Sequence, residues 1–241
     1  MTADAAFASG LLVIDKPLGP TSMQVCANIR ARLRRAGAPK RIKVGHGGTL
    51  DPLATGLLVI LVGKATKLSN TIMVGEKEYD ALIDLSAFSA TDDAQGPITP
   101  VSVTHPPDRA SVDAVVARFV GTIDQLPPDY SAVHVGGVRA YDLARRGHAQ
   151  TLSDGLRPRP VTIHAIDVRS YTWPTLSIHV RSGKGVYIRS LARDIGRALG
   201  TGGYLTALRR TRVGRFSIEQ AVPPNALPAA MTQADLLPAD P

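Results

Sequence analysis

The sequence predicts an α+β fold with a mainly antiparallel mixed sheet flanked by helices. Segments with strand-like alternation and segments with helical spacing follow one another irregularly along the chain, whereas a parallel sheet requires strands and helices in regular alternation. The sequence contains no internal repeat. A chain of 241 residues buries a substantial core, and its 44% hydrophobic and 20% charged residues are ordinary for a globular protein.

Cap and turn residues bound the predicted elements. A helix begins at Thr21 or Ser22, either of which can cap it, and stops at Gly37. Residues 186–200 have the clearest helical spacing, and residues 111–121 predict a capped amphipathic helix. The predicted strands are 10–17, 57–62, 76–85, 160–171, 175–183 and 211–218.

Two segments lack this regularity. Residues 126–150 mix prolines, glycines and arginines, which predicts a long loop or hairpin with a short helix. The tail from 223 to 241 has five prolines and little to bury, so we expect most of it to be loose.

Composition narrows the class of protein. No apolar run approaches the roughly 20 residues that a membrane helix needs, and the N-terminus lacks the basic region of a signal peptide. A single cysteine, Cys26, excludes an internal disulfide and a multi-cysteine metal site. We therefore expect a cytoplasmic protein with no membrane contact.

The net charge of +8 is concentrated in two segments. Residues 30–43 hold seven Lys and Arg and no acid, and residues 181–215 hold nine against the single acid Asp194. Each cluster alone is compatible with a solvated helix face or a contact with anionic lipid. Because the two clusters flank the same glycine-rich turn, they favour a nucleic-acid partner.

That turn, GHGGTLDPLATG (45–56), contains the strongest candidate for a functional residue, Asp51. Glycines let a ligand approach the backbone closely, and the proline after Asp51 biases that residue away from helical geometry. The turn runs into the apolar strand 57–62, so it lies where the core meets solvent. We expect this carboxylate to act on a ligand.

Nucleotide and metal sites are not indicated. The GxGxxG fingerprint fails because Leu50 stands where its last glycine is required, and GKAT (63–66) and SGKG (182–185) lack the spacing of a phosphate loop. The six histidines form no pair with metal-ligand spacing. We expect neither a cofactor nor a metal.

Two tyrosines are candidate platforms for a nucleic-acid base. Tyr79 lies on one face of a predicted strand, and Tyr187 stands between Lys184 and Arg189. A single tyrosine belongs more often to a core, but the glycines on either side of Lys184 favour a ligand-facing role for Tyr187. Arg189 is a suitable cation for Asp51, because a nearby opposite charge favours the ionised carboxylate.

Seven ordered blocks resemble the TruB family of tRNA pseudouridine synthases, which modify the uridine at position 55 in the T-loop. The resemblance runs from residue 10 to about 220, and so many blocks at family spacing are far more specific than one motif. The blocks are DKPLGPTS (15–22), GHGGTLDPLATGLL (45–58), GKATK (63–67), KEYDALIDL (77–85), PPDYSAVHVGGVRAYDLARRG (127–147), SGKGVYIRSLARDIG (182–196) and LRRTRVGRF (208–216).

The resemblance implies a pseudouridine-synthase fold and roles for six residues. Asp51 matches the essential aspartate of the family, Tyr79 the tyrosine that packs on the target base, and Arg189 the arginine that pairs with the catalytic carboxylate. Three further positions match residues that contact the substrate or stabilise its flipped-out conformation: Tyr187, Leu208 and His46.

The implied reaction needs no cofactor. It breaks the N1–C1′ glycosidic bond of uridine, rotates the base and rejoins it through C5, without redox change or energy input. Asp51 could attack C6 of the base or C1′ of the ribose, or assist elimination from the sugar, and the residues do not discriminate among these routes. The implied partner is the T-arm of tRNA, bound by a monomer without an obligatory protein partner.

Two residues depart from the family pattern. Gly47 stands where the family commonly has threonine, and we expect it to loosen the turn. Ala90 stands where aspartate is common, although Asp93 is kept, and we expect this change to affect RNA contacts and not the chemistry.

The resemblance also predicts a domain organisation. Residues 1–222 form the expected catalytic domain, in which 126–150 are an RNA-clamping insertion. The Pro/Ala-rich tail 223–241 stands where family members continue into a small C-terminal RNA-binding domain, which we expect to be absent or truncated.

Two other functions stay open at this point. One is a non-catalytic RNA-binding or tRNA-folding protein that kept the scaffold, against which the intact Asp51, Tyr79 and Arg189 argue. The other is the guide-RNA-dependent relative that acts on ribosomal RNA and relies on its C-terminal domain and protein partners.

Overall fold

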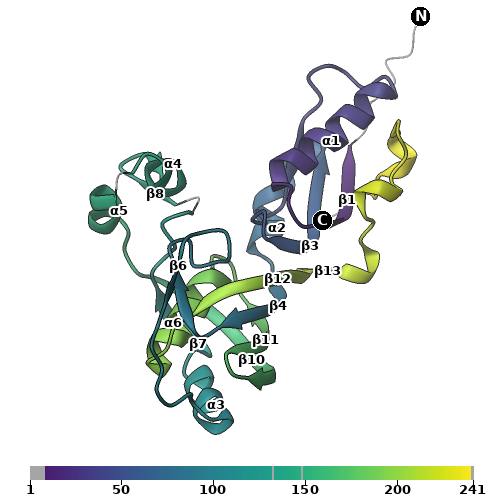
Figure 1. Ribbon diagram of the computed structural model, residues 1–241. Coiled ribbons are helices and arrows are strands. Elements are labelled where there is room, and N and C mark those ends of the chain that lie inside the picture. Colours follow the sequence, from purple (N-terminus) through teal and green to yellow (C-terminus); the bar gives the residue numbers. More distant parts are fainter. Residues whose placement is uncertain (1–8, 132, 148, 240–241) are drawn as a thin grey trace, which may run out of the picture. The chain divides into compact units, whose positions relative to one another are not determined.

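The computed structural model describes residues 9–131, 133–147 and 149–239, which divide into two compact units (Figure 1). Unit 1 comprises the described residues up to Tyr79 together with those from Arg209 onward, and unit 2 comprises Asp80–Leu208. The chain passes between the units within two strands, β4 (Lys77–Asp84) and β12 (Tyr204–Val213). Both ends of the sequence therefore contribute to unit 1.

Unit 1 is built around β3 (Ala54–Val62), which is buried at nearly every position. β1 (Gly10–Lys16) pairs with it antiparallel, and β2 (Val44–His46) does so as well. Such a buried run is typical of a strand covered on both faces. The other elements of the unit are α1 (Ser22–Arg35), η1 (Gly63–Leu68), α2 (Ser69–Val74), β13 (Phe216–Ser217), η2 (Ile218–Gln220), η3 (Pro224–Ala226) and η4 (Gln233–Asp235).

Helix α1 confirms the prediction for its segment. Thr21 and Gln24 form a reciprocal capping box, in which Gln24 N donates to Thr21 Oγ1 (3.1 Å) and Thr21 N donates to Gln24 Oε1 (2.7 Å). The helix buries Cys26, Ile29 and Leu33 completely. Its arginines are left on the outer part of the helix, where they meet solvent or chain carbonyls.

Unit 2 contains the strands β4, β11 (Thr175–Ser182), β10 (Arg159–Thr172) and β7 (Gly121–Gln125) in that spatial order. The pairs β7–β10 and β10–β11 are antiparallel, which confirms the predicted class. The remaining elements are β5 (Ala87–Ser89), β6 (Ile98–Pro100), α3 (Arg109–Ala117), β8 (His134–Val135), β9 (Val138–Arg139), α4 (Ala140–Arg145), α5 (Ala149–Gly155) and α6 (Ile188–Leu199).

The segments predicted with the clearest patterns are confirmed. β4 alternates buried and outward residues as its sequence indicates. Helix α6 buries Ile188, Leu191 and Ile195, and it ends at Gly200, whose φ of 71° is the left-handed conformation that glycine adopts most readily. Residues 126–150 contain the predicted hairpin, β8–β9, and the predicted short helix, α4, while α5 begins at the end of the segment and continues to Gly155.

Two predicted boundaries were wrong. The last strand begins at Tyr204 and not at 211, and β13 folds back on it, with Arg212 opposite Ser217. The strand was missed because Arg210, a charged residue, occupies a buried position in it. Helix α3 begins earlier than predicted, at Arg109, because Asp108 caps it by accepting a hydrogen bond from Ser111 N (2.8 Å).

The expectation of a loose tail was also wrong. Met231 is completely buried, and Leu237 exchanges two backbone hydrogen bonds of 2.9 Å with Leu11 of β1. The Arg32 guanidinium of α1 donates to the carbonyl oxygens of Leu227 (2.6 Å) and Pro228 (2.7 Å). The prolines prevent long helices or strands in the tail, but the tail is still ordered, because its side chains and carbonyls contact other parts of unit 1. No helix in the described part of the chain is long and apolar enough to cross a membrane.

Candidate functional site

Asp51 lies in unit 1 on the turn between β2 and β3, and the segment after β1 holds the turn on both sides of it. Ser22 Oγ donates to Leu50 O (2.9 Å) and accepts from Leu50 N (2.8 Å). Gly19 N donates to Pro52 O (2.9 Å). Because Ser22 and Leu50 are buried, these bonds are shielded from water. The backbone on each side of the half-buried Asp51 is therefore fixed.

Lys16 is a buried cation that interacts with Asp51. Its side chain is completely buried, and Nζ donates to the carbonyl oxygens of Pro17 (2.9 Å) and Pro20 (2.8 Å). Burial lowers the pKa of Lys16 to about 8; the charge of Asp51 opposes this change and that of Arg210 adds to it. Sequence reasoning missed Lys16, although its place on the same strand face as Ile14 was a signal.

Arg210 is the second buried cation at the turn. It is 2% exposed, and its guanidinium donates to the carbonyl oxygens of Leu57 (2.8 Å), Gly48 (3.0 Å) and Thr49 (3.3 Å). Burial lowers the pKa of Arg210, whereas a hydrogen bond with Tyr79 and the charge of Asp51 raise it. The guanidinium thus joins the turn, β3 and the start of β4. Sequence reasoning missed this residue as well, because the strand that carries it was not predicted.

Two buried cations and one half-buried carboxylate on a fixed turn are suited to acid–base or nucleophilic chemistry. Opposite charges nearby favour the ionised form of a carboxylate, and the ionised form is the one that attacks or accepts a proton. The two cations are themselves held by backbone carbonyls, so their positions do not depend on a bound substrate. This part of the site is preorganised within unit 1.

Tyr79 lies on the buried face of β4 and is 9% exposed. Its hydroxyl is hydrogen-bonded to the Arg210 guanidinium. The structure therefore brings Tyr79 and Asp51 to the same arginine, a relationship that the sequence did not reveal. The stacking of Tyr79 on a base stays a prediction.

His46 closes β2 at the entrance to the turn. Its Nδ1 is buried with no hydrogen-bond partner among the described residues. Burial and then the charge of Arg210 lower the pKa of His46 below its usual value. The imidazole is therefore neutral at pH 7, and its contribution to RNA binding, which stays a prediction, would come from hydrogen bonding and packing and not from charge.

Gly47 is held more tightly than the sequence indicated. It is buried, its N–H donates to Val59 O (2.8 Å), and a Cβ placed on it would lie 2.4 Å from Ile72 Cγ2 of α2. The missing side chain leaves the room that Ile72 fills. The expectation that Gly47 loosens the turn was wrong for this reason.

Arg189 lies in unit 2 at the start of α6 and is 5% exposed. Its guanidinium donates to Tyr130 O (2.9 Å) and Thr91 O (3.2 Å), and its Nε lies 3.9 Å from Asp93 Oδ2. These contacts orient the guanidinium. Asp51 and Arg189 belong to different units, and their pairing stays a prediction.

Tyr187 and Leu208 also belong to unit 2. Tyr187 precedes α6, and its backbone N–H and C=O both bond to the buried Gln125 side chain, at 2.8 and 3.1 Å. Its side chain is half-buried, whereas Leu208 on β12 is 9% exposed. The backbone of Tyr187 is therefore fixed while part of its ring stays accessible.

A buried ion pair next to Arg189 is a further feature that sequence reasoning missed. Arg193 Nη1 donates to Asp92 Oδ2 at 2.7 Å, and Asp92 has a φ of 59°, which is uncommon outside glycine. Burial raises the pKa of Asp92, and the charges of Arg193 and Arg189 oppose that rise. The pair ties α6 to the loop that carries Ala90, whose side chain is exposed.

Comparison with models of protein families identifies the family to which the chain belongs. A model described as "TruB family pseudouridylate synthase (N terminal domain)" matches residues 34–188, and one described as "tRNA pseudouridylate synthase B C-terminal domain" matches residues 189–238. The chain belongs to the TruB family. TruB-family enzymes isomerise uridine to pseudouridine in tRNA, and the chain is accordingly a pseudouridine synthase of this class.

Individual TruB-family relatives cover most of the chain. It is 47% identical over 220 residues to "tRNA pseudouridine synthase B" of Novosphingobium aromaticivorans, a match that covers 88% of this chain and 70% of the relative. With the protein of the same name from Bacteroides fragilis, identity is 42% over 226 residues, covering 94% and 95% of the two chains.

Solved structures show the same fold. The TM-score is 0.66 at 31% identity with "Crystal Structure of a Cbf5-Nop10-Gar1 Complex", covering 89% of this chain and 52% of that one. It is 0.65 at 29% identity with "Structure of H/ACA RNP bound to a substrate RNA containing 2'-deoxyuridine", covering 90% and 52%. The chain thus spans about half the length of these two proteins. The predicted pseudouridine-synthase fold is confirmed.

Proposed function

We propose that this TruB-family enzyme converts uridine-55 in the T-loop of tRNA to pseudouridine, with Asp51 as nucleophile or base and without a cofactor. The observation that carries the proposal is the setting of Asp51. Hydrogen bonds from Ser22 and Gly19 fix the backbone on both sides of it, and two buried cations, Lys16 and Arg210, interact with it. These contacts hold the carboxylate in place beside two positive charges before any substrate binds.

The target uridine must leave the stack of its loop before Asp51 can reach it. Base flipping costs a few kcal/mol, and stacking on an aromatic ring returns about 1–3 kcal/mol per base. The resemblance assigns this stacking to Tyr79, with Tyr187, Leu208 and His46 as further substrate contacts. The hydrogen bond between Tyr79 and Arg210 supports this assignment, because it ties the ring's position to the turn that carries Asp51.

The segment 126–150 is proposed to clamp the RNA. Its hairpin and helix α4 form a small apolar cluster with helix α5, which includes Val135, Leu143 and Leu152. Tyr141 is 43% exposed, packs edge-on against Tyr130 (6.1 Å between ring centres), and carries the Arg145 guanidinium 5.6 Å from its ring centre. An exposed ring beside a cation is suited to a base and its phosphate.

Four further expectations stay predictions within this proposal. Arg189 is the cation paired with the catalytic carboxylate. The enzyme is cytoplasmic. It works as a monomer without a protein partner. The catalytic domain ends near residue 222, with the tail 223–241 beyond it.

The deciding experiment incubates the purified chain alone with a T-arm stem-loop and maps pseudouridine in the product. Conversion of uridine-55, lost in Asp51→Ala while RNA binding persists, is the expected result. Undiminished product from Asp51→Ala would overturn the assignment of Asp51. Absence of product with naked RNA, but activity with a guide RNA and protein partners, would favour the guide-dependent function. The solved structures of similar fold are, by their titles, an RNP bound to a substrate RNA and a multiprotein complex.

A further inference from the structure

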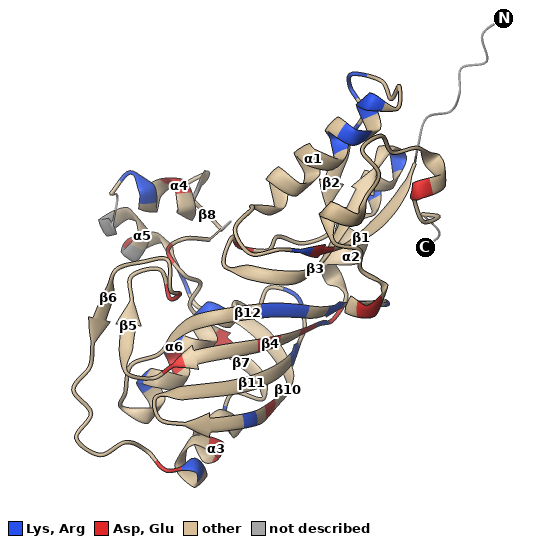
Figure 2. Cartoon of the chain, turned by 45° about the vertical axis from the view of Figure 1, so that its right-hand side comes forward, with Lys and Arg blue, Asp and Glu red and all other residues tan. Residues whose placement is uncertain are grey.

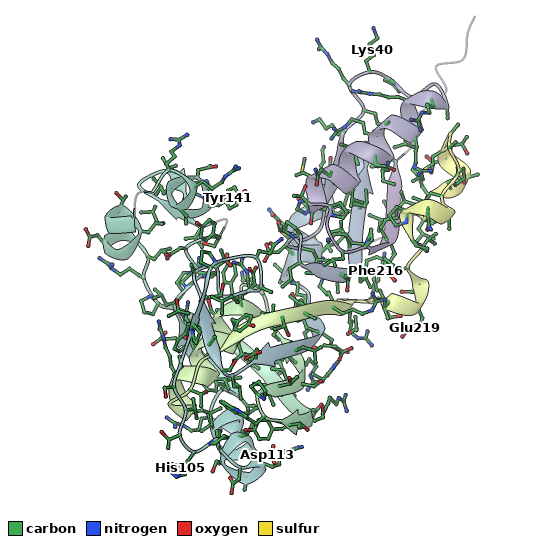
Figure 3. All side chains as sticks on the ribbon, viewed as in Figure 1. Lys40, His105, Asp113, Tyr141, Phe216 and Glu219 are labelled. Carbon is green, nitrogen blue, oxygen red and sulfur yellow. The ribbon has the colours of Figure 1, made fainter. Side chains whose placement is uncertain are left out.

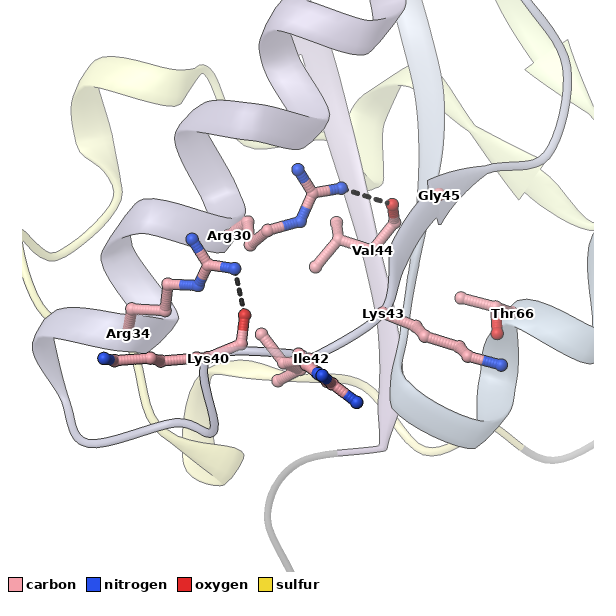
Figure 4. A pocket seen from close by; sticks show the side chains of 9 residues that line it. Arg30, Arg34, Lys40, Ile42, Lys43, Val44, Gly45 and Thr66 are labelled. Carbon is pink, nitrogen blue, oxygen red and sulfur yellow. Dashed lines mark hydrogen bonds between the residues drawn. The ribbon is translucent and has the colours of Figure 1, made fainter.

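A basic groove crosses unit 1 at the end of α1. It consists of two adjoining cavities of about 510 and 380 Å³, which share Arg41, Ile42, Lys43 and Thr66 in their linings. Figure 4 shows the larger of the two. Its lining includes no Asp or Glu. The charged residues that define the basic groove are Arg30, Arg34, Lys40, Arg41, Lys43, Lys64 and Lys67.

The groove is held in shape by hydrogen bonds between the elements that line it. Arg30 Nη2 of α1 donates to Val44 O of β2 (3.0 Å), and the Arg34 guanidinium donates to Lys40 O in the loop between them. Gly63 N of η1 donates to Lys43 O (2.8 Å). Figure 2 shows the concentration of basic residues along this end of α1 and the loop after it, and Figure 3 shows Lys40 at the tip of that loop, extended into solvent.

The positive charge of the groove is not compensated by ion pairs among the residues that the structure describes. None of its seven cations forms an ion pair with another residue of 9–131, 133–147 or 149–239. Two acids of unit 1 form ion pairs outside the groove, Asp15 with Arg209 and Glu78 with Arg212. Like charges gathered on one surface repel one another, and an anion bound from outside relieves that repulsion.

The kind of anion follows from the other lining residues. They are Pro39, Ile42, Val44, Gly45, Gly63 and Thr66, and none of them is aromatic. A surface that reads bases offers rings for stacking or amide groups for hydrogen bonds to base edges. A groove lined by cations, with neither rings nor amide side chains, is best suited to phosphate groups, which are the same at every position of an RNA.

We propose that the basic groove binds the phosphate backbone of the RNA substrate independently of its base sequence. This rests on the proposed function only in taking RNA as the substrate. Gly45 lines the groove and lies in β2, the strand that leads into the Asp51 turn. An RNA backbone seated in the groove is therefore held on the same compact unit as Asp51.

The test compares two double variants that each remove two exposed positive charges. Lys40→Gln with Lys43→Gln changes the groove, and Arg118→Gln with Arg169→Gln is the matched control on unit 2. Binding of tRNA and of an unrelated RNA of equal length is measured between 50 and 300 mM salt. For the groove variant we expect about tenfold weaker binding of both RNAs at the low-salt end and a slope of log K against log salt that is smaller by about 2. The control keeps the wild-type affinity and slope.

Three results would overturn the inference. They are an unchanged slope in the groove variant, an equal loss in the control, and a loss confined to one of the two RNAs, which would mean sequence readout. Vesicles containing phosphatidylserine serve as the competing anionic surface; binding to them that depends on Lys40 and Lys43, with RNA binding intact, would assign the groove to a membrane. The binding assay does not depend on turnover. Its result can therefore be interpreted even if the enzyme does not convert uridine-55.

Discussion

The completely buried ammonium group of Lys16 interacts with the carboxylate of Asp51, and this interaction offsets part of the cost of burying the lysine. The two residues come from different blocks of the sequence, one at the end of β1 and the other on the turn after β2. Each has a fixed backbone, so the two side chains are held near each other before RNA arrives. Four predictions concern this turn and its supports.

Lys16 makes stability depend on pH in a defined window. Its pKa is lowered from 10.5 to about 8, so between pH 8 and 10.5 the unfolded chain binds a proton that the folded chain does not. The free energy of unfolding therefore rises with pH across that window, by roughly 3 kcal/mol from this group. Lys16→Met removes this contribution. The free energy of unfolding of the wild type should therefore rise relative to that of the variant as the pH increases from 8 to 10.

Urea unfolding at each pH, with Lys40→Met as the control at an exposed lysine, measures the difference. Curves for Lys16→Met and wild type that stay parallel from pH 7 to 10 would show that Lys16 is not titrating there.

Asp51→Asn should lower turnover by at least about a thousandfold, because the amide can neither attack nor accept a proton. The asparagine side chain has nearly the same shape and volume as the aspartate, so we expect the affinity for RNA to stay within about threefold of wild type. Asp113→Asn, at an exposed ion pair with Arg109 on α3, is the control. Single-turnover pseudouridine formation with enzyme in excess measures the effect, and turnover above a tenth of wild type in Asp51→Asn would contradict it.

Arg210→Met should destabilise the fold by about 3–5 kcal/mol, since three backbone carbonyls, the Tyr79 hydroxyl and the Asp51 charge lose a buried cation. Arg212→Met, two residues along the same strand, removes a half-exposed partner of Glu78 and should cost less than about 1 kcal/mol. Denaturant unfolding compares the two. If both variants lose the same free energy of unfolding, the hydrogen bonds and charge interactions of Arg210 contribute little to stability.

Gly47→Ala should destabilise by about 1–3 kcal/mol, because its Cβ would lie 2.4 Å from Ile72 Cγ2. At Gly45 the nearest atom to a new Cβ is Thr66 Cγ2 at 4.0 Å, so Gly45→Ala is the matched control with little steric cost. Combining Gly47→Ala with Ile72→Ala should recover part of the loss. A double-mutant cycle in thermal unfolding measures this coupling, and strict additivity would refute the packing argument.

Much of the fold was predictable because local patterns encode it. The capping box at Thr21, the alternation along β4 and the spacing in α6 depend on neighbours within a few residues, so they are legible in the sequence. β12 was missed because its charged Arg210 is buried by elements that lie far away in the chain. The tail was misjudged for the same reason, since Met231 and Leu237 are ordered by contacts with α1 and β1.

By itself the sequence determined the fold class, the two basic segments, the glycine-rich turn with Asp51, and the resemblance from which the TruB family was predicted. Only the tertiary structure decided that Lys16, Arg210 and Tyr79 gather at that turn, that Gly47 makes room for Ile72, and that part of the first basic segment lines a groove. Desolvation and charge interaction depend on every atom that surrounds a group, and those atoms come from β1, β4 and β12 as well as from the turn. Periodicity in a sequence records only which face a residue takes in its own element.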